Sequence, residues 1–554
     1  MDNIKIFALG GLDEDGKNMY VVEVNNKIFV LECGLKYPEN DQLGIEMIIP
    51  DFSYLIKNKK RISAVFISHG NDDVMAAIVN LVKEINVPIY TAPLTAYLIE
   101  SMFKEAGIKK YDLHRVQRNS TFEVDGVEIK TFGVTESIAD AMGIAIKTDH
   151  GYIVYGSEFI FDFDVKIDAF KCDISRLANL GDDGVLLLMG ESVASTREGH
   201  SAPHHKLTPL IEPYFEETED RIVITMYNQN LFRLIEVIEL ANKYNRKIMF
   251  YDDKLREFMQ EVAKLGYYHV PAGLEVPKSK FDNKIENIVV IISGSGSNIF
   301  KRVQNITNKE DPLIEFRKSD TIIIASPSVP GTVREANRME NALYKEGAKV
   351  YATDKKRMFS MHAAIEDLKM MMHLLKPKYY MPVKGEYNQL ISNANIALDM
   401  GYKAENIIVM DNGQVATIKN GELEKQYDQI EIEDVMVDGK ASLDSSGMVL
   451  RDREKLSTDG AIIVGIVINH KTKKIIGGPD VQSRGVIYLK DAEHIVKEIG
   501  IMMENIIETA VKNNKYDNMT CRMEAREAIG KYVLRETGKH PMILPAIIEI
   551  NTTE

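Results

Sequence analysis

The stretch SHGNDDVMAA, residues 68–77, joins a short apolar run (AVFI, 64–67) to a segment whose apolar residues recur with a period near 3.6. This pattern predicts a strand, a polar turn and a helix over residues 73–85. His69 and Asp73 are residue types that bind cations. The same letters also suit a simple turn in which Asn71 or Asp72 caps the helix. The stretch alone leaves both interpretations open.

Composition limits the classes to which the chain belongs. Its 554 residues suggest roughly three to four domains. With 45% hydrophobic and 27% charged residues it is globular, and no apolar run approaches the ~20 residues of a membrane span. The net charge of −14 excludes a whole-body attraction to nucleic acid or anionic membranes.

Targeting and redox signals are consistent with the cytoplasm. The opening MDNIKIFALGG lacks the basic and apolar regions of a signal peptide. Cys33, Cys172 and Cys521 are far apart and odd in number, which excludes a disulfide framework and a thiolate zinc site. We therefore expect a cytoplasmic protein without a membrane partner.

The pattern of elements changes along the chain. The first 210 residues or so read as short strands with occasional helices, and strands and helices then alternate from about 220 to 350. This alternation predicts a mostly parallel sheet, with helices near 230–243, 254–265 and 332–346. Further strands are expected at 377–383 and 406–410. From residue 448 the pattern predicts a compact α+β unit, with strands at 461–470, 473–478 and 484–491 and a last one near 542–550, and helices near 491–513 and 518–536.

Several segments together resemble the RNase J family, two-metal ribonucleases of the metallo-β-lactamase superfamily. They are LGGLDEDGKNMYVVEV (9–24), VLECGLKYPE (30–39), SHGNDDVMAA (68–77), TESIADAMGIAI (135–146), VYGSEFIFD (154–162), SMHAAIEDLKMMMHLLKPKYYMPVKGEY (360–387), MVLRDREKLSTDG (448–460) and GPDVQSRGVIYL (478–489). Their order and spacing follow the family nearly from end to end. Among its members, the chain is most similar to the second paralogue with a degraded active site.

The resemblance implies an α/β fold in several parts. We expect a metallo-β-lactamase αββα sandwich with an inserted β-CASP α/β domain and a small α+β C-terminal domain. The sandwich would be formed by residues 1–208 and 351–430, and the β-CASP domain by 209–350. A linker at 431–447 would lead to the C-terminal domain, 448–554, by resemblance the part through which subunits pair.

The family's metal ligands are only partly present. His69, Asp73, Glu136 and Glu158 occupy ligand positions, but Glu136 replaces a histidine and Glu158 the bridging aspartate. Three further histidines of the family have become Asn71, Val74 and Lys384. An ammonium group has no lone pair to offer a metal ion. Because losing one ligand or its support costs 10–100-fold in metal affinity, the family's usual pair of zinc or manganese ions is not expected.

Two states of the residual pocket remain open. Carboxylates favour hard cations, so one weakly bound manganese, magnesium or calcium ion is one alternative. In the favoured alternative Lys384 supplies the positive charge itself and pairs with Glu136 or Glu158, which would compensate the buried carboxylates. No metal is then expected at full occupancy.

The RNA-facing motifs are also altered. By resemblance, Glu191 is an active-site acid, and Ser360, His362 and Ala363 belong to the loop that holds a 5′ phosphate. Met361 replaces that loop's glycine and places a bulky side chain where backbone must approach closely. Ser293, Gly294 and Ser295 form a Gly-Ser turn that offers backbone N–H groups to phosphate or is only a loop. Asp73, His362 and Glu191 would be vestiges of the catalytic set.

Two functions follow from the resemblance. In the first, the chain is a pseudoenzyme subunit of mRNA decay and rRNA maturation, with little or no nuclease activity, that binds RNA, self-associates and acts beside an active RNase J paralogue. In the second, it is a working 5′–3′ exoribonuclease and endoribonuclease with a carboxylate-rich metal site. Whether the chain is an enzyme stays open at this point.

Overall fold

The computed structural model describes residues 3–39, 44–328, 332–353, 357–438, 441–443, 448–486 and 493–551. The chain divides into two compact units. One comprises Met1–Pro38 and Glu46–Lys440, and the other comprises Glu39–Ile45 and Ala441–Glu554. The larger unit carries three sheets that position the site.

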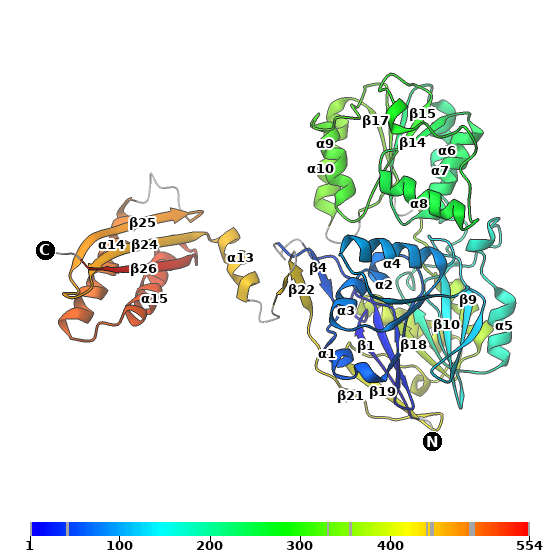
Figure 1. Ribbon diagram of the computed structural model, residues 1–554, viewed down its shortest axis with the longest axis horizontal. Coiled ribbons are helices and arrows are strands. Elements are labelled where there is room, and N and C mark those ends of the chain that lie inside the picture. Colours follow the sequence, from blue (N-terminus) through cyan, green and yellow to red (C-terminus); the bar gives the residue numbers. More distant parts are fainter. Residues whose placement is uncertain are drawn as a thin grey trace. The chain divides into compact units, whose positions relative to one another are not determined.

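Two facing sheets form the centre of the larger unit (Figure 1). The first has the order β20-β19-β1-β2-β3-β5-β6-β7, and β21 also pairs with β19. Its strands are β1 (Asn3–Gly10), β2 (Met19–Val24), β3 (Lys27–Leu31), β5 (Ile62–Ile67), β6 (Pro88–Thr91), β7 (Asp112–Arg115), β19 (Gln414–Lys419), β20 (Glu422–Leu423) and β21 (Asp428–Gln429). The second sheet runs in the order β18 (Tyr379–Val383), β12 (Val185–Glu191), β11 (Gly151–Tyr155), β10 (Met142–Thr148), β9 (Val127–Gly133) and β8 (Thr121–Val124). Ile6 and Phe29 of the first sheet share one buried core with Ile144 and Met381 of the second.

Helices cover the outer face of each sheet. The first is covered by α1 (Ser53–Lys57), α2 (Asp72–Met75), α3 (Ile78–Glu84) and α4 (Pro93–Glu105), and the second by α5 (Ile174–Asp182), α11 (Ile365–Leu375) and α12 (Tyr387–Asp399). Leu81 and Phe103 pack on the first sheet, while Leu177 and Leu368 pack on the second. The layers are therefore αββα, as the family resemblance implies. A short pair formed by β4 (Met47–Ile49) and β22 (Val435–Asp438) completes this part.

The helix expected over residues 73–85 is interrupted, and this prediction was wrong in its continuity. α2 ends at Met75 and α3 begins at Ile78. The carbonyl of Asp73 accepts hydrogen bonds from the backbone and side chain of Asn18, and the N–H of Ala77 donates to Cys33. These neighbours take the groups that would have continued the helix. The strand expected at 406–410 is likewise reduced to one bridge between Ile407 and Tyr380.

The inserted part is a fully parallel sheet among the described residues. Its order is β14 (Lys247–Phe250), β15 (Ile288–Gly294), β13 (Ile222–Tyr227), β16 (Thr321–Ile324) and β17 (Lys349–Ala352). One face packs against α6 (Thr208–Glu217), α7 (Leu231–Lys243) and α8 (Asp253–Lys264), and the other against α9 (Asn298–Thr307) and α10 (Val333–Glu346). Figure 1 shows these helices on opposite sides of the sheet. The predicted parallel sheet and its three helix positions are confirmed.

The smaller unit has a different design, with one sheet covered by helices on one face. β24 (Ala461–Asn469) lies between β25 (Ile475–Arg484) and β26 (Met542–Ile550), and α14 (Glu493–Lys512) and α15 (Asn518–Thr537) pack on one face. α13 (Met448–Thr458), which the sequence did not suggest, precedes β24, and β23 (Ala441–Leu443) comes before it. Most of the strand expected at 484–491 lies outside the described residues.

None of the helices in the described ranges has the length and apolar character needed to cross a bilayer.

Candidate functional site

The candidate site lies where several strands of the two facing sheets end. β11, β12 and β18 are neighbours and run parallel, so their carboxyl ends meet at one edge. Three charged residues lie at this edge. Glu158 comes after β11, Glu191 ends β12, and Lys384 comes after β18. β5 ends at Ile67 and presents His69 from the facing sheet. Loops after sheet strands thus bring together residues more than 300 positions apart.

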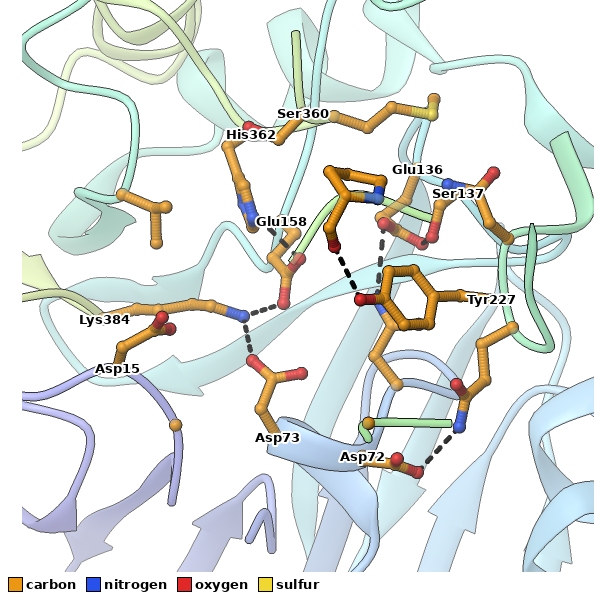
Figure 2. A pocket seen from close by; sticks show the side chains of 18 of the residues that line it. Asp15, Asp72, Asp73, Glu136, Ser137, Glu158, Tyr227, Ser360, His362 and Lys384 are labelled. Atoms are coloured by element: carbon orange, nitrogen blue, oxygen red, sulfur yellow. Dashed lines mark hydrogen bonds and ion pairs between the residues drawn. The ribbon is translucent and has the colours of Figure 1, made fainter. Parts of the chain in front are cut away.

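Lys384 occupies the centre of this site. Its Nζ lies 2.6 Å from Asp73 Oδ2 and also donates to Glu158 Oε1. Figure 2 shows the ammonium reaching between the two carboxylates. Lys384 and Glu158 are 2% and 3% exposed, so this is a buried ion pair. The sequence analysis gave Glu136 and Glu158 as alternative partners of Lys384. The lysine contacts Glu158 and not Glu136, and its second partner is Asp73.

The backbone and the local charges hold this arrangement. Lys384 has a φ of 55°, in the left-handed region that a lysine rarely occupies, and Gly385 follows at 137°. Burial alone would raise the pKa of Asp73, but the Lys384 ammonium, with His69 and His362, lowers it below its ordinary value. Asp73 is therefore ionised and complements the lysine.

His69 retains one nitrogen that faces the carboxylates. The residue is fully buried, and its Nδ1 lies 2.7 Å from Ser68 Oγ. Its Nε2 lies 3.2 Å from Glu158 Oε1 without hydrogen-bond geometry. Ligand atoms of His69, Glu136 and Glu158 all lie within 4.8 Å of one another. This triad is the cation-binding set that the described residues offer.

Glu136 is held by its own loop. Its Oε2 accepts hydrogen bonds from Ser137 Oγ and Ile138 N, both at 2.9 Å, and Oε1 lies 3.4 Å from Asn71 Nδ2. Asn71 stands at the N-cap position of α2, yet its side chain makes no capping bond and turns to Glu136 instead. Val74 is completely buried.

These residues do not fit a binuclear metal centre. Two catalytic cations require bridging and terminal donors on both ions, about 3.5–4 Å apart. The Glu158 oxygen nearest His69 is already bound to the Lys384 ammonium, which also occupies Asp73. One imidazole and two glutamates remain, a donor set for at most one hard cation.

A second group of contacts surrounds Glu191, and both of its carboxylate oxygens have hydrogen-bond partners. Glu191 Oε1 accepts from the N–H groups of Phe159 and Ala363 at 3.0 and 2.9 Å, while Oε2 lies 2.8 Å from His362 Nδ1. Burial lowers the pKa of His362, but the Glu191 carboxylate outweighs it and leaves this pKa raised. Glu191 thus fixes the 360–363 loop and favours a charged imidazole.

The two predicted phosphate loops are placed differently. Ser360, Met361 and His362 line a cleft of about 510 Å³ above Lys384, and the Met361 side chain is 4% exposed. Ala363 is buried behind them. Ser293 and Gly294 are buried at the end of β15 and do not line the cleft, and neither does Ser295, whose hydroxyl bonds to Tyr37. From that loop only Gly296 lines the cleft.

Sequence reasoning missed a bridge across this cleft. Asp72 Oδ2 accepts from Tyr37 Oη at 2.5 Å. Asp72 Oδ1 accepts from Gln229 Nε2 at 2.7 Å (Figure 2). Gln229 belongs to the inserted part and Asp72 to the sandwich. The sequence suggested Asp72 only as a helix cap, because its partner Gln229 lies 157 residues away along the chain. Arg197, Tyr227 and Arg233 also line the cleft and were missed because they lie outside the motifs quoted above.

Family models cover most of the inserted and C-terminal parts. Residues 219–343 match "Ribonuclease J, beta-CASP domain", 348–407 match "Zn-dependent metallo-hydrolase RNA specificity domain", and 448–550 match "Ribonuclease J C-terminal domain". Proteins named Ribonuclease J 2 from Staphylococcus epidermidis and Staphylococcus aureus are 31% identical over 551 residues, which is 99% of this chain and 98% of theirs. The chain belongs to the ribonuclease J family.

A solved structure also shares the fold of this ribonuclease J-family chain. It is described as a protein of unknown function from Enterococcus faecalis V583, and it is 15% identical. The match covers 75% of this chain and all of that one, with a TM-score of 0.54. At this identity the likeness concerns the architecture alone.

Proposed function

We propose that this ribonuclease J-family chain is a subunit with a degenerate two-metal site and little or no intrinsic nuclease activity. The observation that carries the proposal is the Lys384 ammonium bound between Asp73 and Glu158. A cation fixed to the chain replaces a metal ion that would otherwise hold the attacking hydroxide and clamp the phosphate. Without that hydroxide the normal hydrolysis has no nucleophile.

In this proposal the cleft keeps a role in binding RNA. Ser360, His362 and Arg197 line it, and the charged imidazole favoured by Glu191 suits a phosphate oxygen. We assign to the chain a structural or regulatory role beside an active RNase J paralogue in mRNA decay and rRNA maturation. The domain boundaries given above, with the linker at 431–447, are part of the same proposal.

Self-association is assigned to the C-terminal domain. Its helices cover one face of the sheet, where Ile462 and Val464 are buried. The other face exposes large apolar side chains of two adjacent strands, Ile463, Leu544, Ile548 and Ile550, each between 38% and 54% exposed. Grouped apolar surface of this kind is typical of an interface.

The alternative function is a ribonuclease with one hard cation in the His69, Glu136 and Glu158 triad. The proximity of their ligand atoms favours it. A single cation would have to compete with Lys384 for Glu158, which weakens its binding.

Nuclease and metal assays on the purified full-length chain test the proposal. We expect less than one metal ion per chain, and no mononucleotide release from 5′-monophosphorylated RNA with manganese. Robust release that disappears in His69→Ala would establish the alternative. The control variant His114→Ala changes an exposed histidine outside the site and should behave as the parent chain.

Partner assays test the subunit role. An active RNase J paralogue from the same cell should co-purify with the chain, and the pair should dissociate when Ile548 is replaced by Asp. If neither a paralogue nor a second copy of the chain co-purifies, the subunit role is wrong.

A further inference from the structure

The helix α10 of the inserted part carries its basic residues on one exposed face. Met339 and Leu343 are buried in the core beside the sheet. With 3.6 residues per turn, the face opposite these two contains Arg334, Arg338 and Lys345. All three basic side chains are exposed. We call these three residues the basic face of α10.

The acidic residues of the helix do not neutralise this face. Glu335, Glu340 and Glu346 are half-buried and lie toward the packed side of the helix. Within the described ranges, no carboxylate forms an ion pair with any residue of the basic face. Arg334 and Arg338 are four residues apart, a spacing at which like charges repel each other on a helix. A polyanionic ligand would remove this repulsion.

An aromatic and two amide side chains share the face. Tyr344 is 55% exposed, so its ring is open to a ligand. Asn337 and Asn341 are exposed as well, and Asn341 Nδ2 donates to the carbonyl of Asn337 at 2.9 Å. Basic side chains that contact phosphates, combined with an aromatic ring on which a base stacks, are typical of surfaces that bind single-stranded nucleic acid. An acidic peptide would contact the cations but has no base to stack on the ring.

The basic face begins within reach of the cleft of the candidate site. Pro327 lines this cleft, and its carbonyl accepts from the hydroxyl of Tyr227, another lining residue, at 2.6 Å. α10 begins at Val333, six residues further along, which is at most about 20 Å of extended chain. From Arg334 to Lys345 the helix rises by about 16 Å, the length of about five stacked nucleotides at roughly 3.4 Å each. A strand that leaves the cleft therefore has a continuous surface to follow.

We propose that the basic face of α10 binds single-stranded RNA that extends from the cleft, with phosphates on Arg334, Arg338 and Lys345 and a base stacked on Tyr344. The proposal rests on the RNA-binding role proposed above for the cleft and adds a second contact site on the inserted part. The net charge of −14 excludes attraction by the protein as a whole, so the affinity for RNA depends on local surfaces of this kind. Long RNA should then bind more tightly than short RNA.

Fluorescence anisotropy of the full-length chain with labelled oligouridylates of about 6 and about 24 nucleotides, in EDTA, tests the proposal. The short RNA occupies the cleft alone, whereas the long RNA also reaches α10. We expect the combined variant Arg334→Gln, Arg338→Gln and Lys345→Gln to bind the long RNA at least about tenfold more weakly and the short RNA as the parent chain does. Its slope of log K against log salt should be less steep by about 2, because each phosphate contact to a single strand contributes about 0.7.

Two further variants separate charge from stacking. Lys254→Gln, Lys264→Gln and Lys280→Gln together remove the same charge from exposed positions of the inserted part and should bind both RNAs as the parent chain does. Tyr344→Leu should weaken binding of the long RNA severalfold without changing the salt slope, because a stacked base releases no counterion.

The proposal is overturned if the α10 variant and the charge-matched variant bind the long RNA equally. If Arg197→Gln still weakens the short RNA in that case, the RNA-binding role of the cleft stands and only the contact at α10 is wrong. Polyaspartate is the probe for an acidic protein partner. If polyaspartate binds the parent chain but not the α10 variant, while the long RNA binds both equally, the face is a protein-docking surface and the proposal is wrong. If the short RNA is insensitive to Arg197→Gln but the long RNA still depends on α10, the role of the cleft is contradicted and the contact at α10 is retained.

Discussion

The two halves of the candidate site differ in the groups that hold their carboxylates. Around Glu191, every contact expected of a structural carboxylate is present, with two backbone N–H groups and the His362 imidazole in place. Around Asp73 and Glu158, the His69 imidazole lies close to Glu158, and the Lys384 ammonium fills the space between the two carboxylates. The contrast indicates that backbone N–H groups hold the carboxylate of one half, whereas a single ammonium group compensates both carboxylates of the other.

This contrast also explains why the pocket remains folded. A buried carboxylate without compensation destabilises a protein strongly, whether or not the site is used. One half is stabilised by backbone donors, which no side-chain substitution removes. The other half depends on a single side chain, and substitutions can therefore separate the two halves experimentally.

The largest expected effect comes from restoring the missing imidazoles. In the combined variant Asn71→His, Val74→His, Glu136→His and Lys384→His, manganese content should rise toward about two ions per chain. Each restored ligand contributes roughly 10–100-fold in affinity. Elemental analysis measures this, with the Asn71→His, Val74→His and Glu136→His triple variant as the matched control that keeps Lys384. Equal metal content in both variants would mean that Lys384 does not block the site.

Replacing Lys384 by Met should be the most destabilising single substitution of the site. It leaves Asp73 and Glu158 facing each other without a cation, at a cost of about 3–5 kcal/mol in the free energy of unfolding. Urea denaturation measures the change. Lys378→Met, at the entry to the same strand, removes an exposed pair with Glu422 and should cost less than about 1 kcal/mol. Similar losses for both variants would contradict a central role for Lys384.

The half of the site around Glu191 should contribute to the pH dependence of the free energy of unfolding. The pKa of His362 is raised in the folded protein, so the imidazolium stabilises the fold below its unfolded pKa of about 6.5. That contribution is lost as the pH rises from this value through the folded pKa, with a slope of at most about 1.4 kcal/mol per pH unit. His362→Gln should flatten the slope in this window. An unchanged slope would assign the titration to another group.

The smallest effect on stability is expected for the hydrogen bonds of Asp72, which join two lobes, the sandwich and the inserted part, across the cleft. Asp72→Asn replaces the carboxylate that joins Tyr37 to Gln229 and should cost about 1 kcal/mol, because the amide oxygen can still accept one of the two hydrogen bonds. The spacing of two labels, one on each lobe, measured by fluorescence transfer should widen. Gln229→Ala should reproduce the widening, and a spacing that stays constant in both variants would show that Asp72 does not hold the lobes.

The sequence was most informative where a pattern depends on burial. The alternating strands and helices of residues 220–350 reveal a parallel sheet because strands buried on both faces are continuous apolar runs. The break between α2 and α3 was out of reach, since it is imposed by Asn18 and Cys33 from elsewhere in the chain. Sequence motifs indicated the residues of the site, but they did not indicate their pairing. Lys384 binds Asp73, and Glu136 contacts Asn71 instead of the lysine.

The C-terminal part shows a further limit of pattern reading. Buried and exposed side chains alternate along β26, with Leu544 and Ile548 on the exposed side, but its almost continuously apolar sequence, MILPAIIEI, does not distinguish the two faces. The helix α13 has a polar sequence without a clear apolar stripe, so no hydrophobic periodicity indicated a helix there.

The lysine bound between two acids has a consequence for the cell. A metal centre is filled from a shared pool, and chelators or metal starvation can empty it, whereas an ammonium group attached to the main chain cannot diffuse away. The central charge of this pocket is supplied at translation, and the pocket should fold identically in metal-poor and metal-rich media.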